Sequence, residues 1–90
     1  MQIFKYSLDP RQDYIELPKG ARILSIQSQY EVPQLWALVD SKNSIVKRKV
    51  IFAVTGQNLT PDELKGMVYV ATGQLSHGNF VYHVFIEEEK

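Results

Sequence analysis

Apolar residues along this chain form short runs, and turn-forming residues interrupt each run. This pattern is typical of β-strands joined by tight connections, whereas helices repeat their apolar positions every three or four residues. The interruptions contain proline, glycine, aspartate and asparagine, all of which favour turns. The sequence therefore predicts at most seven strands, over residues 1–6, 14–17, 21–30, 35–39, 45–55, 67–72 and 79–86.

The pattern within two of these runs indicates what each strand faces. Side chains alternate along a strand, so Leu24 and Ile26 of the run 21–30 are expected on one face. Residues 35–39 are apolar at every position, which predicts a central strand covered on both faces. Residues 74–78 are expected to form the loop between the last two strands.

One helical turn is predicted near residues 60–65. Thr60 can cap a helix, Pro61 suits the first helical position, and Gly66 ends the pattern. No longer helix is indicated, so the crossover that joins parallel strands is missing. The expected fold is all-β and mainly antiparallel, a small sandwich or partly open barrel of six to seven strands in one domain, residues 1–90.

Composition narrows the classes of function. Ten basic and ten acidic residues cancel, so the chain lacks the positive charge of a protein that binds long nucleic acids. It has no cysteine and two histidines, which excludes disulfides and argues against a metal site. We find no membrane span and no signal-peptide pattern, and therefore expect a cytoplasmic protein. Because a 90-residue domain buries a limited core, we also expect a homo-oligomer.

One tripeptide occurs twice, because two of the predicted strands end in Thr-Gly-Gln, at Thr55-Gly56-Gln57 and at Thr72-Gly73-Gln74. Threonine and glycine are ordinary strand-end residues, and glycine often only permits a positive φ. The functional interpretation is that both glycines let a ligand approach the backbone while the threonines supply hydroxyls. Uncharged donors of this kind can bind phosphate or the edge of a base.

His83 and Trp36 likewise each have a structural and a ligand-binding interpretation. His83 lies inside an apolar strand, where it is either a half-buried histidine with structural partners or a contact to a planar ligand. Trp36 is either part of the core or a platform for stacking. No catalytic residue is assigned, because the sequence contains no nucleophile motif, catalytic carboxylate pair or phosphate-binding loop. We therefore expect that the protein is not an enzyme and uses no cofactor.

The whole chain resembles a family of small stand-alone proteins, found mostly in bacteriophages and bacterial genomes and classed as a domain of unknown function. The likeness rests on residues 3–6 (IFKY), 17–24 (LPKGARIL), 35–40 (LWALVD), 55–56 (TG) and 82–85 (YHVF). This chain has Gln57 where relatives tend to carry histidine, and Tyr82 where they tend to carry tryptophan. If these positions touch a ligand, specificity differs in this member.

The resemblance implies a phage accessory protein that acts by binding in the cytoplasm of the host cell. The leading hypothesis is a sponge that sequesters a cyclic nucleotide immune signal. The alternatives are an inhibitor that binds a host enzyme and a small virion-associated structural protein. The candidate ligand-binding residues are Lys5, Tyr6, Trp36, Thr55, Gly56, Gln57, Thr72, Gly73, Tyr82 and His83.

Overall fold

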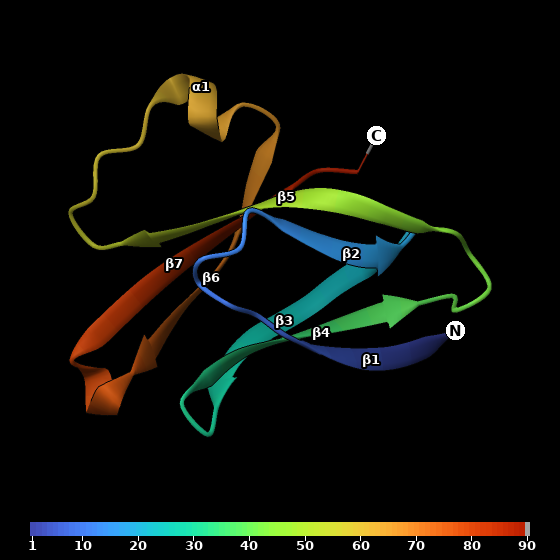
Figure 1. Ribbon diagram of the computed structural model, residues 1–90, viewed down its shortest axis with the longest axis horizontal. Helices are drawn as coiled ribbons and strands as arrows, with labels where there is room; N and C mark the ends of the chain where they lie inside the picture. Colours follow the sequence, from blue (N-terminus) through green and yellow to red (C-terminus); the bar gives the residue numbers. More distant parts are fainter. Residues whose placement is uncertain (90) are drawn as a thin grey trace.

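The computed structural model describes residues 1–89 and contains seven strands and one short helix (Figure 1). A single 3-10 turn, Ser76–Gly78, joins the last two strands. The elements are β1 (Gln2–Ser7), β2 (Tyr14–Pro18), β3 (Arg22–Gln29), β4 (Val32–Val39), β5 (Ile45–Val54), α1 (Pro61–Leu64), β6 (Met67–Leu75) and β7 (Phe80–Glu87).

The strands form two sheets. One has three strands in the order β1–β4–β3, and the other has four in the order β2–β5–β7–β6. All neighbouring strands run antiparallel. The sheets face each other without closing into a barrel (Figure 1), so the predicted all-β, sandwich-like fold is confirmed.

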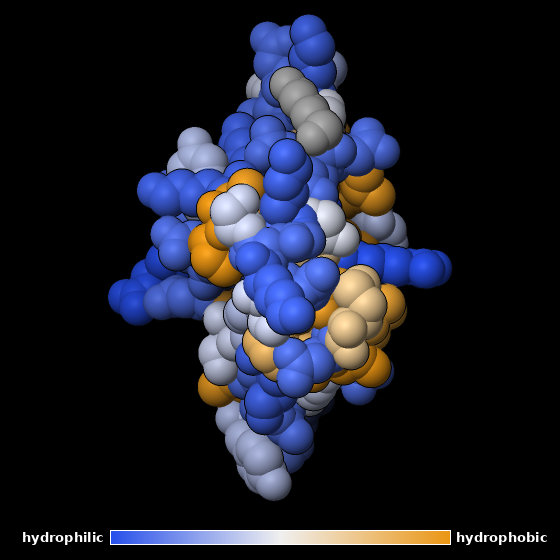
Figure 2. Space-filling model, turned by 90° about the vertical axis from the view of Figure 1, so that its right-hand side faces the viewer, coloured by the Kyte–Doolittle hydropathy of each residue, from blue (hydrophilic) through white to orange (hydrophobic). Residues whose placement is uncertain are grey.

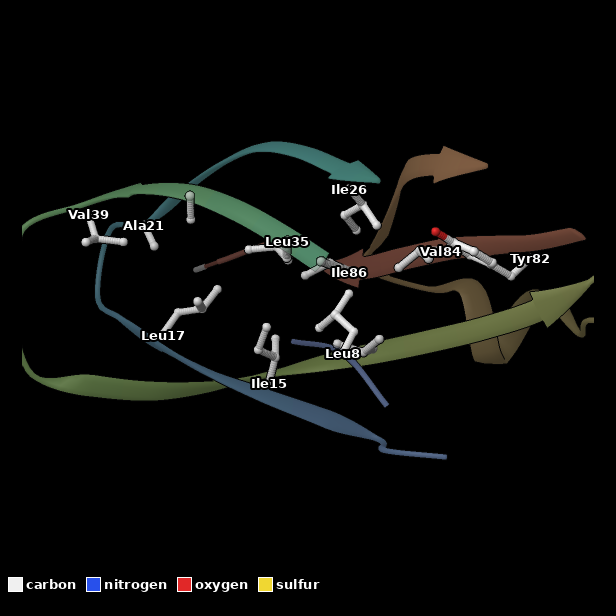
Figure 3. Packing of buried hydrophobic residues seen from close by; sticks show 12 residues of the cluster. Leu8, Ile15, Leu17, Ala21, Ile26, Leu35, Val39, Tyr82, Val84 and Ile86 are labelled. Carbon is white, nitrogen blue, oxygen red and sulfur yellow. The ribbon is translucent and has the colours of Figure 1, made fainter. Parts of the chain in front are cut away.

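The core lies between the two sheets, and Figure 3 shows side chains from both pointing into it. Every second residue of a strand faces this layer, as the pleat requires. Burying these side chains removes apolar surface from water, which is the main stabilising contribution in so small a domain. The buried cluster comprises Leu8, Ile15, Leu17, Ala21, Ile26, Leu35, Ala37, Val39, Val50, Tyr82, Val84 and Ile86.

The predicted helical turn is confirmed. Thr60 is the N-cap, and its hydroxyl accepts a hydrogen bond from the backbone N–H of Glu63 while the Glu63 carboxylate accepts one from the N–H of Thr60. This capping box satisfies backbone donors that the helix leaves open. Pro61 occupies the first helical position, as expected. In Figure 1, α1 lies next to the start of β6, on the side away from the three-stranded sheet.

The predicted orientation of β3 is wrong. Its register with β4 shifts between Ile23 and Ser25, so Ile23 and Ile26 both pack against the core while Leu24 is 45 % exposed. A β-bulge inserts one extra residue and reverses the alternation that follows it. Leu24 and Ile26 therefore do not share a face.

Two further expectations differ from the structure. β6 runs on to Leu75, so the predicted loop 74–78 shrinks to the turn Ser76–Gly78. β4 is the central strand of its sheet, as predicted, but only one face is covered by a second sheet. Trp36, on the other face, is therefore only half-buried.

The surface is largely hydrophilic on the side drawn in Figure 2, with separate apolar patches between the polar side chains. Within residues 1–89, no helix is both long enough and apolar enough to cross a membrane.

Candidate ligand-binding site

The two threonines of the repeated Thr-Gly-Gln stretch meet at His83. Thr55 follows the end of β5, Thr72 lies on β6, and His83 lies on β7 between these two strands. His83 is opposite Thr72 in the register, and Thr55 reaches it across β5 and β7. Hydrogen bonds join Thr55 Oγ1 to His83 Nε2 at 2.7 Å and Thr72 Oγ1 to His83 Nδ1 at 2.9 Å. Both ring nitrogens are thus held, and the imidazole is fixed in orientation.

Tyr69 extends this cluster, and sequence reasoning missed it. Its hydroxyl lies 2.6 Å from Thr72 Oγ1, and its ring packs edge-on against Phe85 with centroids 5.7 Å apart. A β-bulge between Tyr69 and Ala71 places Tyr69 and Thr72, three residues apart, on the same face. The alternation of an unbroken strand would put them on opposite faces, so the pattern gave no signal for this contact.

These side chains lie on the outer face of the four-stranded sheet. His83 alternates along β7 with Tyr82 and Val84, which are buried in the core. Thr55, Thr72 and Tyr69 are exposed and His83 is half-buried, so a ligand can reach the hydroxyls and the ring. We call Thr55, Tyr69, Thr72 and His83 the outer-face cluster.

The outer-face cluster can offer a hydroxyl hydrogen at either end. A neutral imidazole donates at one nitrogen and accepts at the other, while a hydroxyl can do both. With the proton on Nε2, His83 donates to Thr55 and accepts from Thr72, which leaves the hydroxyl hydrogen of Thr55 for a ligand. With the proton on Nδ1, the roles reverse, and the free hydroxyl hydrogen lies at the Thr72–Tyr69 end.

The same face continues along the strands as an apolar ridge followed by a positive charge. Phe85 pairs with Ile51 on β5, next to the pair formed by Ala53 and His83. Lys49 lies two residues further along β5 on this face. A strand rises about 3.3 Å per residue, so Lys49 lies ~13 Å from Ala53. The Glu87 carboxylate accepts a hydrogen bond from the Lys49 N–H at 3.1 Å, so hydroxyls, aromatic surface and then an ammonium group with a nearby carboxylate follow one another along one face.

Gly56 and Gln57 form the turn that leads out of β5. The N–H of Gln57 donates to the carbonyl of Val54 at 3.0 Å, and the side-chain oxygen of Gln57 accepts from the N–H of Val54 at 3.1 Å. Gly56 has φ +89°, a conformation that glycine adopts without strain. A Cβ built on Gly56 meets no atom within 4 Å, so the space beside it is open.

Gly73 and Tyr82 face the core instead. They are paired in the register, and a Cβ on Gly73 would lie only 2.2 Å from the Tyr82 ring. Tyr82 is 1 % exposed, and its hydroxyl lies 2.9 Å from Ser28 Oγ. The lack of a side chain at Gly73 thus makes room for a buried ring, and the structure does not bring these two residues to the outer-face cluster.

Three other candidates lie on the three-stranded sheet. Lys5 is opposite Trp36 on the outer face of that sheet, and its ammonium group donates to Gln29 Oε1 at 3.0 Å. Tyr6 is half-buried and packs against the core. The two outer faces point in opposite directions across the sandwich, so Lys5 and Trp36 are not part of the outer-face cluster.

Charge is distributed without a concentrated centre. Among residues 1–89 the one ion pair joins Arg11 and Asp9 at 2.8 Å, at the exposed turn after β1. The side-chain hydrogen bond from Arg11 lowers the pKa of the Asp9 carboxyl to about 2. The described part of the chain contains no group of three histidine, aspartate or glutamate residues that could hold a metal ion.

Comparison with known proteins places the chain in a family without an assigned activity. The family described as "Domain of unknown function (DUF7352)" matches residues 1–90, so the chain belongs to it. No curated protein matches the chain. No solved structure matches it either.

Proposed function

We propose that this protein is a non-enzymatic binding protein for a small nucleotide, which it holds on the outer face of the four-stranded sheet. One observation carries the proposal: both ring nitrogens of His83 are engaged by Thr55 and Thr72. A histidine oriented in this way, with hydroxyl donors at either end, suits recognition of a base edge or a phosphate oxygen.

The neighbouring side chains support a nucleotide over other small ligands. Tyr69 and Phe85 form an aromatic pair beside the hydroxyls, and such surfaces stack on bases. Lys49 lies on the same face beyond this pair and can attract a phosphate. A nucleotide presents these two chemistries, a planar base and an anion, at opposite ends.

The surroundings of His83 also support binding without catalysis. In a hydrolytic triad, the histidine lies between a nucleophile and an orienting carboxylate. Among residues 1–89, the hydrogen-bond partners of the His83 ring are the two neutral hydroxyls of Thr55 and Thr72. The resemblance to phage proteins suggests the setting, in which the protein would sequester a cyclic nucleotide immune signal in the host cytoplasm.

A panel of cyclic di- and trinucleotides, with linear mononucleotides for comparison, tests the proposal by thermal shift and calorimetry. A ligand that binds only the native state raises Tm. We expect one member to bind wild-type protein, and His83→Gln and Thr72→Val to weaken that binding tenfold or more. His77→Gln changes the other histidine, in the exposed turn before β7, and should bind like wild type.

Three outcomes would contradict the proposal. One is the absence of binding by any nucleotide at high micromolar concentration. Another is equal binding by the His77→Gln and His83→Gln variants. The third is chromatographic conversion of a bound nucleotide that His83→Gln abolishes, because this would show catalysis.

A second candidate function is binding of a protein partner by strand addition to β1. This strand pairs with β4 along one edge, and the other edge is open. Ile3 is 61 % exposed on it, and Phe4 is also exposed. Open apolar edges are templates for pairing with another strand.

The partner on β1 is either a host protein or a second copy of this chain. Light scattering of the purified protein separates these cases. A dimer that Ile3→Lys converts to a monomer supports self-assembly through β1. A monomer that captures one host protein stoichiometrically supports inhibition of a host enzyme, and a monomer without any partner removes this candidate.

A further inference from the structure

A groove opens between the facing edge strands of the two sheets, and Tyr69 of the outer-face cluster lies on its border. β3 and β6 lie next to each other there but are not hydrogen-bonded into one sheet. The groove has a volume of about 410 Å³. Its apolar walls come from Ile23 and Leu24 of β3 and Val68 and Val70 of β6, with Ile86 also lining it.

Each of the two strands carries a β-bulge at this groove. β3 bulges between Ile23 and Ser25, and β6 bulges between Tyr69 and Ala71. Bulges bend an edge strand and redirect its side chains, and they are frequent beside functional sites. Further along the same two strands, the hydroxyl of Ser28 donates to the carbonyl of Gln74 at 2.7 Å and holds the two edges together.

Arg48 brings a positive charge to the groove. It lies on the inner face of β5, opposite Ile15, while Lys47 and Lys49 point to the outer face. Its Nε donates to the carbonyl of Glu87 at 3.0 Å, and one terminal nitrogen donates to the carbonyl of Ala21 at 3.1 Å. A guanidinium group has five N–H donors, so it keeps donors beyond these two bonds.

Arg48 forms no ion pair within residues 1–89, although Glu87, Glu88 and Glu89 line a neighbouring pocket together with it. The one ion pair among residues 1–89 lies elsewhere, between Arg11 and Asp9. Arg22 also lines the groove and adds a second positive charge, and Glu88 at its end is the acidic residue there. A half-buried guanidinium beside apolar walls suits an anion that carries an apolar body.

We propose that the groove between β3 and β6 binds an anionic amphiphile. A single carboxylate or phosphate head contacts Arg48 and Arg22, and an unbranched apolar chain lies between the bulged strands. The volume of the groove accommodates on the order of ten methylene-sized groups, because each takes up roughly the 30 Å³ of a water molecule. This site adjoins the proposed nucleotide site, because Tyr69 lines the groove and belongs to the outer-face cluster, but its anion contacts and apolar walls come from other residues.

Calorimetry with an alkyl series tests the proposal on the whole protein. From hexanoate to decanoate, we expect the affinity to rise about fourfold for each added methylene, the factor for burial of one such group. Decanol, which has the same chain and no charge, should bind at least tenfold more weakly than decanoate. Decyl phosphate compares the two head groups, and tighter binding of either one supports the proposal.

Two variants identify the anion contact. Arg48→Met should reduce the affinity for decanoate about tenfold or more and leave decanol binding unchanged, since one charge-assisted contact is lost. Lys47→Met, its neighbour on the opposite face of β5, should bind decanoate like wild type. Arg22→Gln serves as a second variant in case Arg48→Met does not fold.

The place of binding is read from amide NMR spectra. Decanoate should shift the amide signals of Ile23, Leu24 and Val70, and His83→Gln should leave its affinity unchanged. Three results would overturn the proposal: equal affinity for decanoate and decanol, shifts confined to other strands, or no binding at millimolar ligand. None of these results bears on nucleotide binding, so the two proposals fail separately.

Discussion

Substitution of Gly73 by alanine tests the packing that separates the two faces of β7. A Cβ at this position would lie 2.2 Å from both the Cζ and the hydroxyl oxygen of Tyr82. Tyr82 is 1 % exposed, and a Cβ so close to its ring forces the ring out of its present position. Overpacking of this kind costs about 1–3 kcal/mol. Loss of the hydrogen bond between Tyr82 and Ser28 adds about 1 kcal/mol.

The expected destabilisation of Gly73→Ala is therefore about 2–4 kcal/mol. For a domain of this size, this corresponds to a fall in Tm on the order of 10–25 °C. Denaturant titration followed by tryptophan fluorescence measures the free energy of unfolding, with Trp36 as the single reporter. Gly56→Ala is the matched control, because that position has a positive φ but open space around it. It should cost only the backbone term, about 1 kcal/mol.

A double-mutant cycle with Tyr82→Leu isolates the steric contact. Once the ring is gone, a Cβ at Gly73 no longer meets it, and the alanine should cost less than about 1 kcal/mol. The reasoning is refuted if Gly73→Ala is within about 0.5 kcal/mol of wild type. It is also refuted if the alanine costs the same amount in both backgrounds.

Two further predictions concern turns at the surface. Tyr30 is 92 % exposed and has φ +52° in the two-residue turn between β3 and β4. Tyr30→Asn should therefore raise the free energy of unfolding by about 0.5–1 kcal/mol. An unchanged denaturation midpoint would contradict this. The second prediction concerns the Asp9 carboxyl, whose pKa the hydrogen bond from Arg11 lowers to about 2. Since folding lowers this pKa, its contribution to stability is present above pH 3.8 and is lost as the pH falls through about 2. Arg11→Ala should return the carboxyl pKa toward 3.8 in a carbon-13 NMR titration, and a midpoint that stays near 2 would disprove the assigned cause.

Much of the fold could be predicted from local signals. The alternation of apolar and turn-forming residues placed the strands, and the residues from Thr60 to Pro61 placed the helix start. The two β-bulges could not be predicted, because a bulge depends on which strand pairs with which, and the apolar pattern carries no such information. The bulge in β3 reversed the predicted faces of Leu24 and Ile26.

The candidate site was predicted in part. Repetition of Thr-Gly-Gln singled out Thr55 and Thr72, and the structure brings both to His83. The second repeat was expected at a strand end and lies inside β6 instead, because Gly73 accommodates the Tyr82 ring rather than a turn. The order of strands in the two sheets separates the other candidates, and that order is a property of the tertiary fold.

The order β2–β5–β7–β6 has a consequence for synthesis of the chain. β7 is made after the other three strands, yet it lies between β5 and β6. Val50 of β5 pairs with Ile86, 36 residues later in the chain, so β5 keeps one edge open until residues 80–87 leave the ribosome. Nascent chains with unpaired strand edges are prone to aggregation. Codon choice can slow translation of the stretch between β5 and β7, and a bound chaperone can shield it. Either intervention should therefore alter the yield of native protein more than the same intervention near β1.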